Sequence, residues 1–544
     1  MAWYKKLQVP IREGGARTFL INDDIRPLPP SRRQWTKLYY ISFWAMNQIC
    51  LSNWQVGAGL VATGLSVWQV VVAVVIGKII TAMVAVANGM VGGVWHIGFP
   101  VTSRFVWGLY GSYLAMLQRI LLGLIWFGVQ SWTGGLSVSC MLGAIFPSYQ
   151  NMRNTLPASA NMTTKEFTGY IVYNLLIIPL LYIPPERMRK MLLGMNIVVF
   201  VTLMSMMIYI LSAAHGAGPL LSKPATVQSG SQLAWAIMGG IQTVIGSIAV
   251  GLTNQPDYSR FAKSPGDQIF GQYFSITLFG VIMPFFGCLT TSATIKLYGE
   301  AIWNPPNIAL RWLEDNYSSG ARAGAFFCGL GFVVCQLAIN TVDNAFSFGM
   351  DTAALFPKYI NIRRGAYIGL VLSIALTPWN LLATATTFIN VMSAYSVFLG
   401  PMVGIMIFHY FFVVHQKVKL SDLFTTSREG IYYYWYGFNW RAFVAWVIGF
   451  APQLPGFINA VNPSIKVPQA CVHMFQICFK LGFAISFFVY YLINRFFPPR
   501  GAGEFDAIDY FNTFTEKEAA ALGVMLQDDA IVDNEDEDDI IKTQ

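Results

Sequence analysis

Apolar stretches of about twenty residues recur through the sequence, from near residue 39 to near residue 496. A helix needs about 20 apolar residues to cross a bilayer, and only structures that satisfy their own backbone hydrogen bonds can do so. Only 11% of the residues are charged, against about a quarter in soluble proteins. We therefore predict an all-α polytopic membrane protein with twelve transmembrane helices, whose approximate limits are 39–64, 66–88, 110–146, 168–183, 191–213, 232–253, 270–297, 321–345, 365–380, 386–414, 439–459 and 472–496.

Lysine and arginine are distributed unevenly between the connections. Residues 1–38 carry eight of them, and the loops that follow the fourth, sixth, eighth and tenth spans are also basic. Loops that face the cytoplasm carry the excess of positive charge, so both termini are expected to be cytoplasmic. The sequons at Asn161 and Asn316 then fall on the opposite side, where glycosylation takes place.

The segment 497–544 is predicted to be an acidic cytoplasmic C-terminal tail. It contains thirteen acidic residues and three basic ones, a net charge of −10. This composition is consistent with an inert, solvated tail. Lys517 and Lys542 allow a second interpretation, in which the tail binds a ubiquitin-ligase adaptor.

Two of the apolar segments carry polar side chains at helical spacing. Trp126 and Gln130 are four residues apart in the third span, and Asn340 and Asn344 are four apart in the eighth. Residues at this spacing share one face of a helix. Because an amide in hydrocarbon costs several kcal/mol without partners, we predict that these faces line a shared internal cavity that binds a flat, polar solute.

The first span contains a polar cluster at membrane depth. Ser52, Asn53 and Gln55 lie beside glycines in the stretch LSNWQVGAG. A discontinuous helix that faces a solute needs such residues, but a glycine-lined helix contact explains them equally well. Lys78 is the lone charge of the second span and is expected to extend to the membrane interface.

Several sequence strings resemble the fungal Fur-type branch of the nucleobase-cation symporter family. The resemblance implies a LeuT-like fold: two inverted five-helix repeats in a transport core of residues 39–415, then a cytoplasmic loop and two peripheral helices in residues 416–496. It also implies a plasma-membrane carrier that moves uracil, allantoin, uridine, thiamine, nicotinamide riboside or a related heterocycle inward with a cation. The strings are NWQVGAGLVATGLSVWQ, HIGFPVTSRFVWGLYGSY, WFGVQSW, NQPDYSRFAK and ALFPKYINIRRG.

The resemblance also assigns site residues. The stacking tryptophan and the amide that the family carries on the third span fall on Trp126 and Gln130, and its asparagines on the eighth span fall on Asn340 and Asn344. Ile248 stands where bacterial relatives place a second stacking tryptophan. Substrate contacts are thus expected from these four polar or aromatic residues, with Ser52 of the first span in addition.

The coupling ion is expected to be a proton. Ala338 and Ile339 occupy positions where sodium-coupled members carry adjacent hydroxyl groups, and a hard cation needs oxygen ligands. Asp343, an acid inside the eighth span, is functional by default: it is a proton carrier, a counter-charge for a cationic vitamin, or a salt-bridged structural acid. Asp257 at the cytoplasmic end of the sixth span and Phe388 in the tenth are candidates for coupling or gating.

The predicted function is proton-coupled uptake of a uracil- or allantoin-like heterocycle by alternating access. A nucleoside or a cationic vitamin is an alternative substrate, and a non-transporting substrate sensor is an alternative function. An enzyme is not expected, because the sequence has no HExxH, GxSxG or Walker A motif and its five histidines are scattered. No cofactor, metal or nucleic-acid partner is therefore expected; the expected partners are the heterocycle, protons, membrane lipid and the adaptor at the C-terminal tail.

Overall fold

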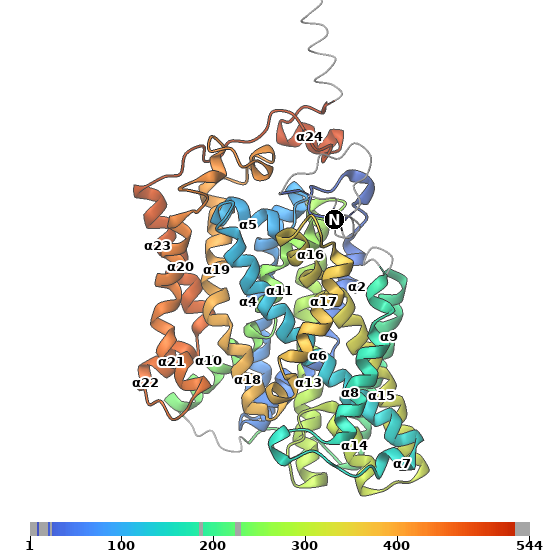
Figure 1. Ribbon diagram of the computed structural model, residues 1–544. Helices are drawn as coiled ribbons and strands as arrows, with labels where there is room; N and C mark the ends of the chain where they lie inside the picture. The colour runs from blue at the N-terminus through green and yellow to red at the C-terminus, as the bar shows by residue number, and fades with distance from the viewer. Residues whose placement is uncertain (1–7, 10–19, 22–23, 184–188, 224–229, 528–544) are drawn as a thin grey trace, which may run out of the picture.

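The chain forms a bundle of long helices that share one principal direction (Figure 1). The computed structural model describes residues 8–9, 20–21, 24–183, 189–223 and 230–527. Within these residues, strand-like pairing is limited to three isolated bridges. The predicted all-α class is therefore confirmed.

Residues 37 to 213 build the first part of the bundle. Its long central helix is α6, which carries the Trp126–Gln130 face, and α4 packs beside the first span. The helices of this part are α2 (Lys37–Gln48), α3 (Leu51–Ala62), α4 (Val67–Trp95), α5 (Phe99–Trp107), α6 (Ser112–Ile145), α7 (Pro147–Gln150), α8 (Thr164–Ile177) and α9 (Arg189–Ala213).

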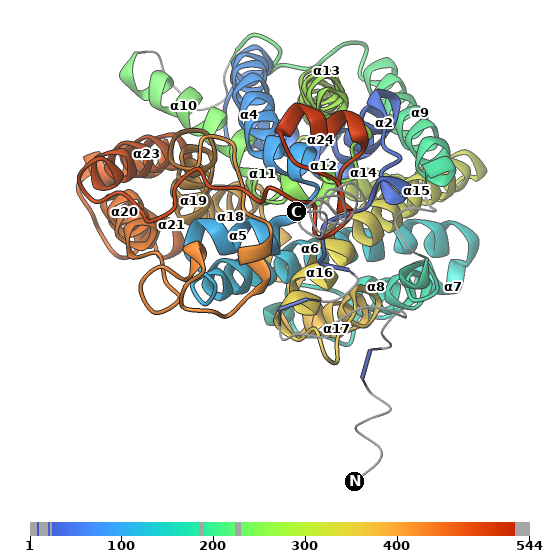
Figure 2. The same cartoon turned by 90° about the horizontal axis from the view of Figure 1, so that it is seen from above.

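The second part of the bundle is followed by a peripheral group. Figure 2 shows that α20, α21 and α23 lie to one side of the other long helices, next to α19. The helices are α10 (Ser231–Gly246), α11 (Ala249–Thr253), α12 (Gln255–Ser259), α13 (Pro265–Tyr298), α14 (Pro305–Asp315), α15 (Ser319–Ile339), a π-helix (Asn340–Ala345), α16 (Phe346–Leu355), α17 (Ile362–Ala375), α18 (Ala385–Ala394), α19 (Ser396–Phe408), α20 (Trp440–Phe450), α21 (Leu454–Val461), α22 (Gln469–Phe475), α23 (Cys478–Phe496) and α24 (Glu516–Leu522).

Seven spans in the described residues are long and apolar enough to cross a membrane, and the bent pair α22–α23 makes an eighth. Four further predicted spans coincide with helices that are short or broken, namely α2 with α3, α8, α10 with α11, and α17. The protein is thus a multi-pass membrane protein, while the count of twelve spans stays a prediction. The eighth span also continues to Leu355 rather than ending at 345.

The first predicted span is a broken helix. α2 ends at Gln48, and α3 begins after Ile49 and Cys50, at the start of the polar stretch for which a break was one of the two explanations. Cys50 Sγ accepts a hydrogen bond from the backbone N–H of Asn53 at 3.4 Å, and Asn53 Nδ2 donates to the carbonyl oxygen of Gln48 at 2.9 Å. These local bonds satisfy backbone groups that the break exposes, which allows irregular backbone to lie within the bundle.

The glycines of α3 have a separate role in packing. A side chain added at Gly57 would lie 2.3 Å from the backbone oxygen of Pro284, so α3 and α13 approach as closely as glycine permits. Both explanations of the LSNWQVGAG stretch therefore hold: it follows a helix break and it forms a glycine-lined contact.

The sixth predicted span is broken as well, which the sequence did not indicate. α10 ends at Gly246 and α11 begins at Ala249. A side chain at Gly246 would lie 2.1 Å from the backbone oxygen of Met392, and the hydroxyl of Tyr395 donates to the Gly246 carbonyl at 2.7 Å. The segment around α18 thus packs against the end of α10 and satisfies one of the carbonyl groups that the break exposes.

The two tails meet at one end of the bundle, near α5 and α24 (Figures 1 and 2). Arg33 donates to both carboxylate oxygens of Glu518 at 2.7 and 2.8 Å, and it also contacts His96. Part of the predicted acidic tail is therefore packed against the bundle, since Phe514 beside α24 is buried. Lys542 and the acidic run at residues 533–539 lie outside the described residues.

Candidate functional site

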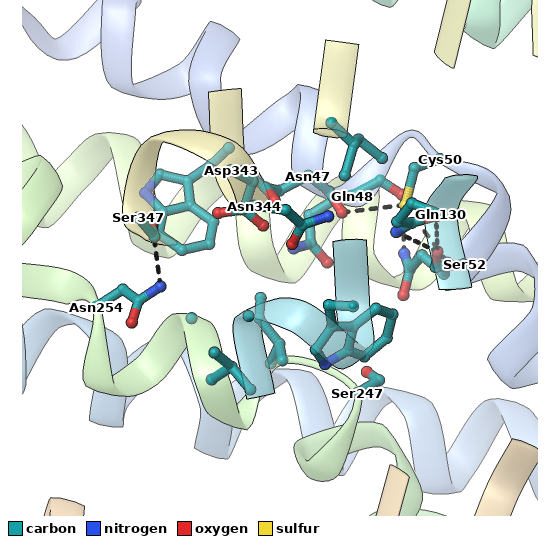
Figure 3. A pocket seen from close by; sticks show the side chains of 18 of the residues that line it. Asn47, Gln48, Cys50, Ser52, Gln130, Ser247, Asn254, Asp343, Asn344 and Ser347 are labelled. Carbon is teal, nitrogen blue, oxygen red and sulfur yellow. Dashed lines mark hydrogen bonds between the residues drawn. The ribbon is translucent and has the colours of Figure 1, made fainter. Parts of the chain in front are cut away.

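A central cavity lies where the two broken helices meet α6 and the π-helix (Figure 3). The space between the lining side chains, including the part open to solvent, is about 820 Å³. Its polar lining comes from segments far apart in the sequence. The lining includes Trp44, Asn47, Gln48, Cys50, Ser52, Asn53, Lys78, Arg119, Trp126, Gln130, Ser247, Ile248, Asn254, Asp343, Asn344, Ser347 and Asp351.

The α6 wall shows the predicted pair of an indole and an amide. Trp126 and Gln130 both line the cavity, and Ser52 of α3 bonds to the amide. Ser52 Oγ lies 2.7 Å from Nε2 and 3.0 Å from Oε1 of Gln130. A glutamine amide offers two N–H donors and two acceptor positions, so one donor and one acceptor position of Gln130 are left for a bound molecule.

The asparagines of the eighth span have different surroundings. Asn344 lines the cavity, whereas Asn340 does not belong to its lining. Asn340 Nδ2 instead lies 3.0 Å from Ser131 Oγ of α6, and its Oδ1 accepts a hydrogen bond from Asn344 Nδ2 at 2.7 Å. Asn340 therefore fixes the orientation of Asn344. Both lie in the π-helix, a distortion that occurs frequently at functional sites.

Asp343 borders the same cavity. Its Oδ1 accepts a hydrogen bond from the hydroxyl of Tyr258 at 2.6 Å, and that hydroxyl lies 2.8 Å from Ser347 Oγ. No lysine or arginine among the described residues forms an ion pair with Asp343. The carboxylate is thus held by a neutral donor and is open to a proton or a cationic ligand.

A buried charged cluster borders the cavity next to the part of α6 that precedes Gly123 and Trp126. Arg119 of α6 donates to Asp257 of α12 at 2.6 Å and to Asn254 at 3.1 Å, and it forms a bidentate contact with Asp351 of α16. Asp257 also accepts a hydrogen bond from the backbone N–H of Phe99 at the start of α5, at 2.8 Å. Asp257 does not line the cavity and acts as part of this cluster, which ties α5, α6, α12 and α16 together.

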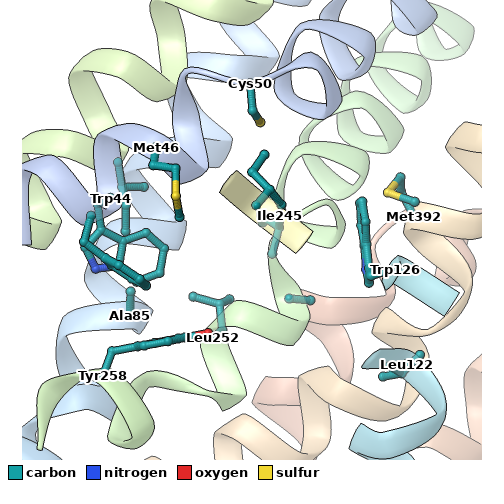
Figure 4. Close-up of a cluster of buried hydrophobic side chains, with 14 of the residues drawn as sticks. Trp44, Met46, Cys50, Ala85, Leu122, Trp126, Ile245, Leu252, Tyr258 and Met392 are labelled. Carbon is teal, nitrogen blue, oxygen red and sulfur yellow. The ribbon is translucent and has the colours of Figure 1, made fainter. Parts of the chain in front are cut away.

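Phe388 lies apart from the cavity lining. It is buried in α18 and stacks on Trp303, with 5.3 Å between the ring centroids. The same region provides Met392, which Figure 4 shows beside Trp126 in the buried apolar cluster. The structure therefore connects the Phe388 segment to the tryptophan wall through packing.

Several cavity residues were missed by the sequence analysis. Trp44, Asn47 and Gln48 belong to α2 immediately before the first break, where a polar face preceding a break was the available signal. Lys78 was expected to extend to the membrane interface, and this expectation is wrong. Only 1% of its surface is exposed, and its Nζ donates to Gln48 Oε1 at 2.8 Å inside the bundle.

A cavity lined by two helix breaks within a bundle of membrane-length helices defines the chain as a membrane transporter of the broken-helix class. Residues 27–482 match a family described as permeases for cytosine and purines, uracil, thiamine and allantoin. The chain belongs to this family, the nucleobase-cation symporters.

Known proteins support the same assignment. The chain is 46% identical to the transporter aclS of Aspergillus oryzae, over 93% of this chain and 91% of the relative. It is 35% identical to nicotinamide riboside transporter 1 of Saccharomyces cerevisiae, over 95% of this chain and 86% of the relative. Its fold is similar to that of Mhp1, a nucleobase-cation-symport-1 transporter in a closed conformation with bromovinylhydantoin bound. The TM-score is 0.70 at 20% identity, with 92% of this chain and 99% of Mhp1 covered. The predicted LeuT-like fold class is thus confirmed.

Proposed function

We propose that the chain is a proton-coupled transporter that takes up a flat, polar heterocycle of the uracil or allantoin type by alternating access. The observation that carries this proposal is the cavity in which the Trp126–Gln130 wall and Asn344 come together between two broken helices. Sites in this class of transporter lie at such breaks, and rocking of the helices around them changes access.

Each residue of the wall has a distinct proposed role. The indole of Trp126 stacks on the ring, because offset stacking of aromatic faces is favourable. Gln130 and Asn344 pair with the alternating N–H and C=O groups of the ring edge, which matches the donors and acceptors of an amide. Ser52 and Asn340 hold those two amides in place through the hydrogen bonds described above.

Coupling to protons is supported by the composition of the eighth span. Ala338 and Ile339 offer no hydroxyl ligands for sodium, whereas Asp343 provides a carboxylate at the cavity. Asp257 in the arginine cluster and Phe388 on Trp303 are proposed to control access from the two sides, because each joins elements next to the cavity. We further propose a plasma-membrane location with both termini in the cytoplasm, based on the basic loops.

A cationic vitamin is the second candidate substrate. The observation in its favour is Asp343, which borders the cavity without an ion-pair partner in the described part of the chain. The similarity to nicotinamide riboside transporter 1 points the same way. In that case Asp343 would serve as a counter-charge.

A competition panel tests these proposals. Cells that lack their own carriers would express the chain and receive radiolabelled uracil, allantoin, uridine, thiamine or nicotinamide riboside, each with and without a protonophore. We expect concentrative uptake of a neutral ring that the protonophore abolishes. Uptake of thiamine or nicotinamide riboside alone would favour the second candidate. Binding without accumulation of any of the five compounds would identify a sensor instead.

A further inference from the structure

Lys78 is a buried cation that the proposed transport roles do not use. It projects from α4 into the lining of the central cavity, and its ammonium group donates a hydrogen bond to Gln48 Oε1. No carboxylate in the described residues lies within ion-pair distance of its ammonium group. A buried ammonium without an ionic partner is costly. Negative potential from another source is therefore needed around it.

The end of α2 is a candidate source of this potential, because the side chain that accepts from Lys78 belongs to the last residue of α2. Gln48 is the last residue of α2, and α2 stops inside the bundle at the first break. The last carbonyl groups of a helix lack intrahelical partners and carry roughly half a negative charge between them. In transporters built on broken helices, such half-helix ends coordinate the coupling cation.

We infer that Lys78 is a tethered cation that stands at the end of α2 in place of a free coupling cation and holds α2 in its packed position. α13 packs closely against the contact between Lys78 and Gln48. A side chain at Gly280 of α13 would meet Lys78 Cδ at 2.8 Å and Gln48 Oε1 at 2.9 Å. The lack of a side chain at Gly280 therefore leaves the room that the lysine stem and the glutamine amide occupy.

The other groups around the cavity are consistent with this assignment. Ala338 and Ile339 provide no side-chain oxygen for a free cation, and Arg119 is already paired with Asp351. Cys50 at the break is a thiol and Asp343 a carboxylate, and both line the cavity with Lys78. Lys78 would thus supply the fixed positive charge, and Asp343 would remain available for the proton.

The test is thermal unfolding of the purified full-length protein in detergent, in choline, sodium or methylammonium chloride at equal ionic strength. Lys78→Ala removes the ammonium group and leaves space for a small cation. We expect its Tm to lie below that of the wild type in choline chloride. We expect Tm to rise by about 2 °C or more in sodium or methylammonium chloride, because a ligand that binds only the folded state stabilises it. The wild type should not respond to the change of cation.

Two further variants separate charge from packing. Lys78→Met fills most of the same space without a charge, so it should have a lowered Tm in all three salts. Lys78→Arg keeps a cation at this position and should lie closer to the wild type than Lys78→Met does. Lys480→Ala is the matched control, because Lys480 lies in α23 outside the cavity and donates to the Met238 carbonyl at 3.5 Å. It should show no dependence on the cation.

The inference is overturned if Lys78→Ala has the same Tm in all three salts, or if Lys78→Met is as stable as the wild type. Should Lys78→Ala fail to yield folded protein, the comparison of Lys78→Met with Lys78→Arg still decides. A transport measurement rests on the proposed function and uses whichever labelled ring the wild type accumulates. Sodium should stimulate uptake of this ring by Lys78→Ala. Sodium should not stimulate uptake by the wild type. Absence of any uptake by the wild type would refute the proposed function and leave the Tm result unaffected.

Discussion

The hydroxyl oxygen of Ser52 lies 2.7 Å from Nε2 of Gln130, so the first broken helix and α6 share a polar contact in the wall of the central cavity. The contact leaves half of the hydrogen-bonding capacity of the amide unused. It also positions that half, because the serine restricts rotation of the glutamine side chain.

The first prediction concerns this pair. Gln130→Ala should nearly abolish uptake, because a site built to hydrogen-bond a ring edge loses up to about ten-thousand-fold when a partner is missing. Ser52→Ala removes only the orienting contact and should raise KM less than Gln130→Ala does. Ser137→Ala is the control, because Ser137 is buried in α6, the helix of Gln130, and donates to the Thr133 carbonyl. Uptake would be compared at equal surface levels, and unchanged KM for Gln130→Ala would remove the amide from the site.

The second prediction concerns the indole. Trp126→Phe keeps an aromatic face and should retain partial uptake. Trp126→Ala should lose roughly 1 kcal/mol or more of stacking, which is about a fivefold or greater fall in affinity. Binding of the transported ring to purified protein measures this directly. Trp132→Phe provides a comparison within the same helix, because Trp132 packs on Tyr170 and Trp379 away from the cavity lining, and it should leave affinity unchanged.

The third prediction concerns coupling. Uptake should rise as the external pH falls from about 7 to 5, and it should be insensitive to replacement of sodium by choline, because a proton is the proposed driving ion. Asp343→Asn should abolish accumulation and retain exchange of labelled for unlabelled substrate, because the exchange step needs no net proton movement. Strict dependence of the wild type on sodium would contradict proton coupling. Unchanged accumulation by the variant would exclude Asp343 from it.

The fourth prediction concerns the Arg119 cluster. Arg119→Ala leaves Asp257 and Asp351 buried without their cation, and the expected loss of stability is about 3–5 kcal/mol. Combining it with Asp257→Asn and Asp351→Asn removes the unpaired charges and should recover most of the stability. Unfolding of the purified variants measures both effects. If Arg119→Ala were as stable as the wild type, the cluster would not be holding the four helices together.

The fifth prediction concerns the contact between the tails. Burial raises the pKa of Glu518, but hydrogen bonds from His96 and Arg33 outweigh it and hold the pKa well below its usual value. Burial lowers the pKa of His96. Near pH 7 the ionised carboxylate of Glu518 stabilises the folded state, and His96 has no ionisation cost there because its imidazole is neutral. Their contribution falls on acidification, first below the usual histidine pKa of about 6.5 and then below that of glutamate, about 4.3.

Limited proteolysis of the C-terminal segment measures this contact. Glu518→Gln should expose the segment to protease at pH 7, and Arg33→Gln should do the same. The double variant should be no more sensitive than either single one, because both remove one interaction. Glu516→Gln, on the same helix, should behave as the wild type. Equal protease resistance of all four variants would show that the contact does not hold the tail.

The residues that could be anticipated from the sequence are those whose signal is local. Trp126 and Gln130 lie on one helix face, so their spacing alone predicted a shared wall. The first break has polar residues within one helical turn on both sides, so composition indicated a break as one of two explanations of that stretch.

The features that were missed depend on distant partners. The second break lies in an apolar stretch, and a carbonyl group it exposes is satisfied by Tyr395, 149 residues further along the chain. Lys78 was placed at the interface because a lone lysine in an apolar span usually extends there. Its partner Gln48 belongs to another span. No local pattern identifies such pairs, because their energy arises only when the helices have packed.

The tail contact also has a consequence for how the protein is made. Arg33 and Glu518 are separated by 485 residues, and ribosomes add roughly 5–20 residues per second. The amino-terminal segment is therefore synthesised about 25–100 s before its partner exists. During that interval nothing from the carboxyl-terminal end can cover Arg33, so its pairing with Glu518 is an event that only a fully translated chain can undergo.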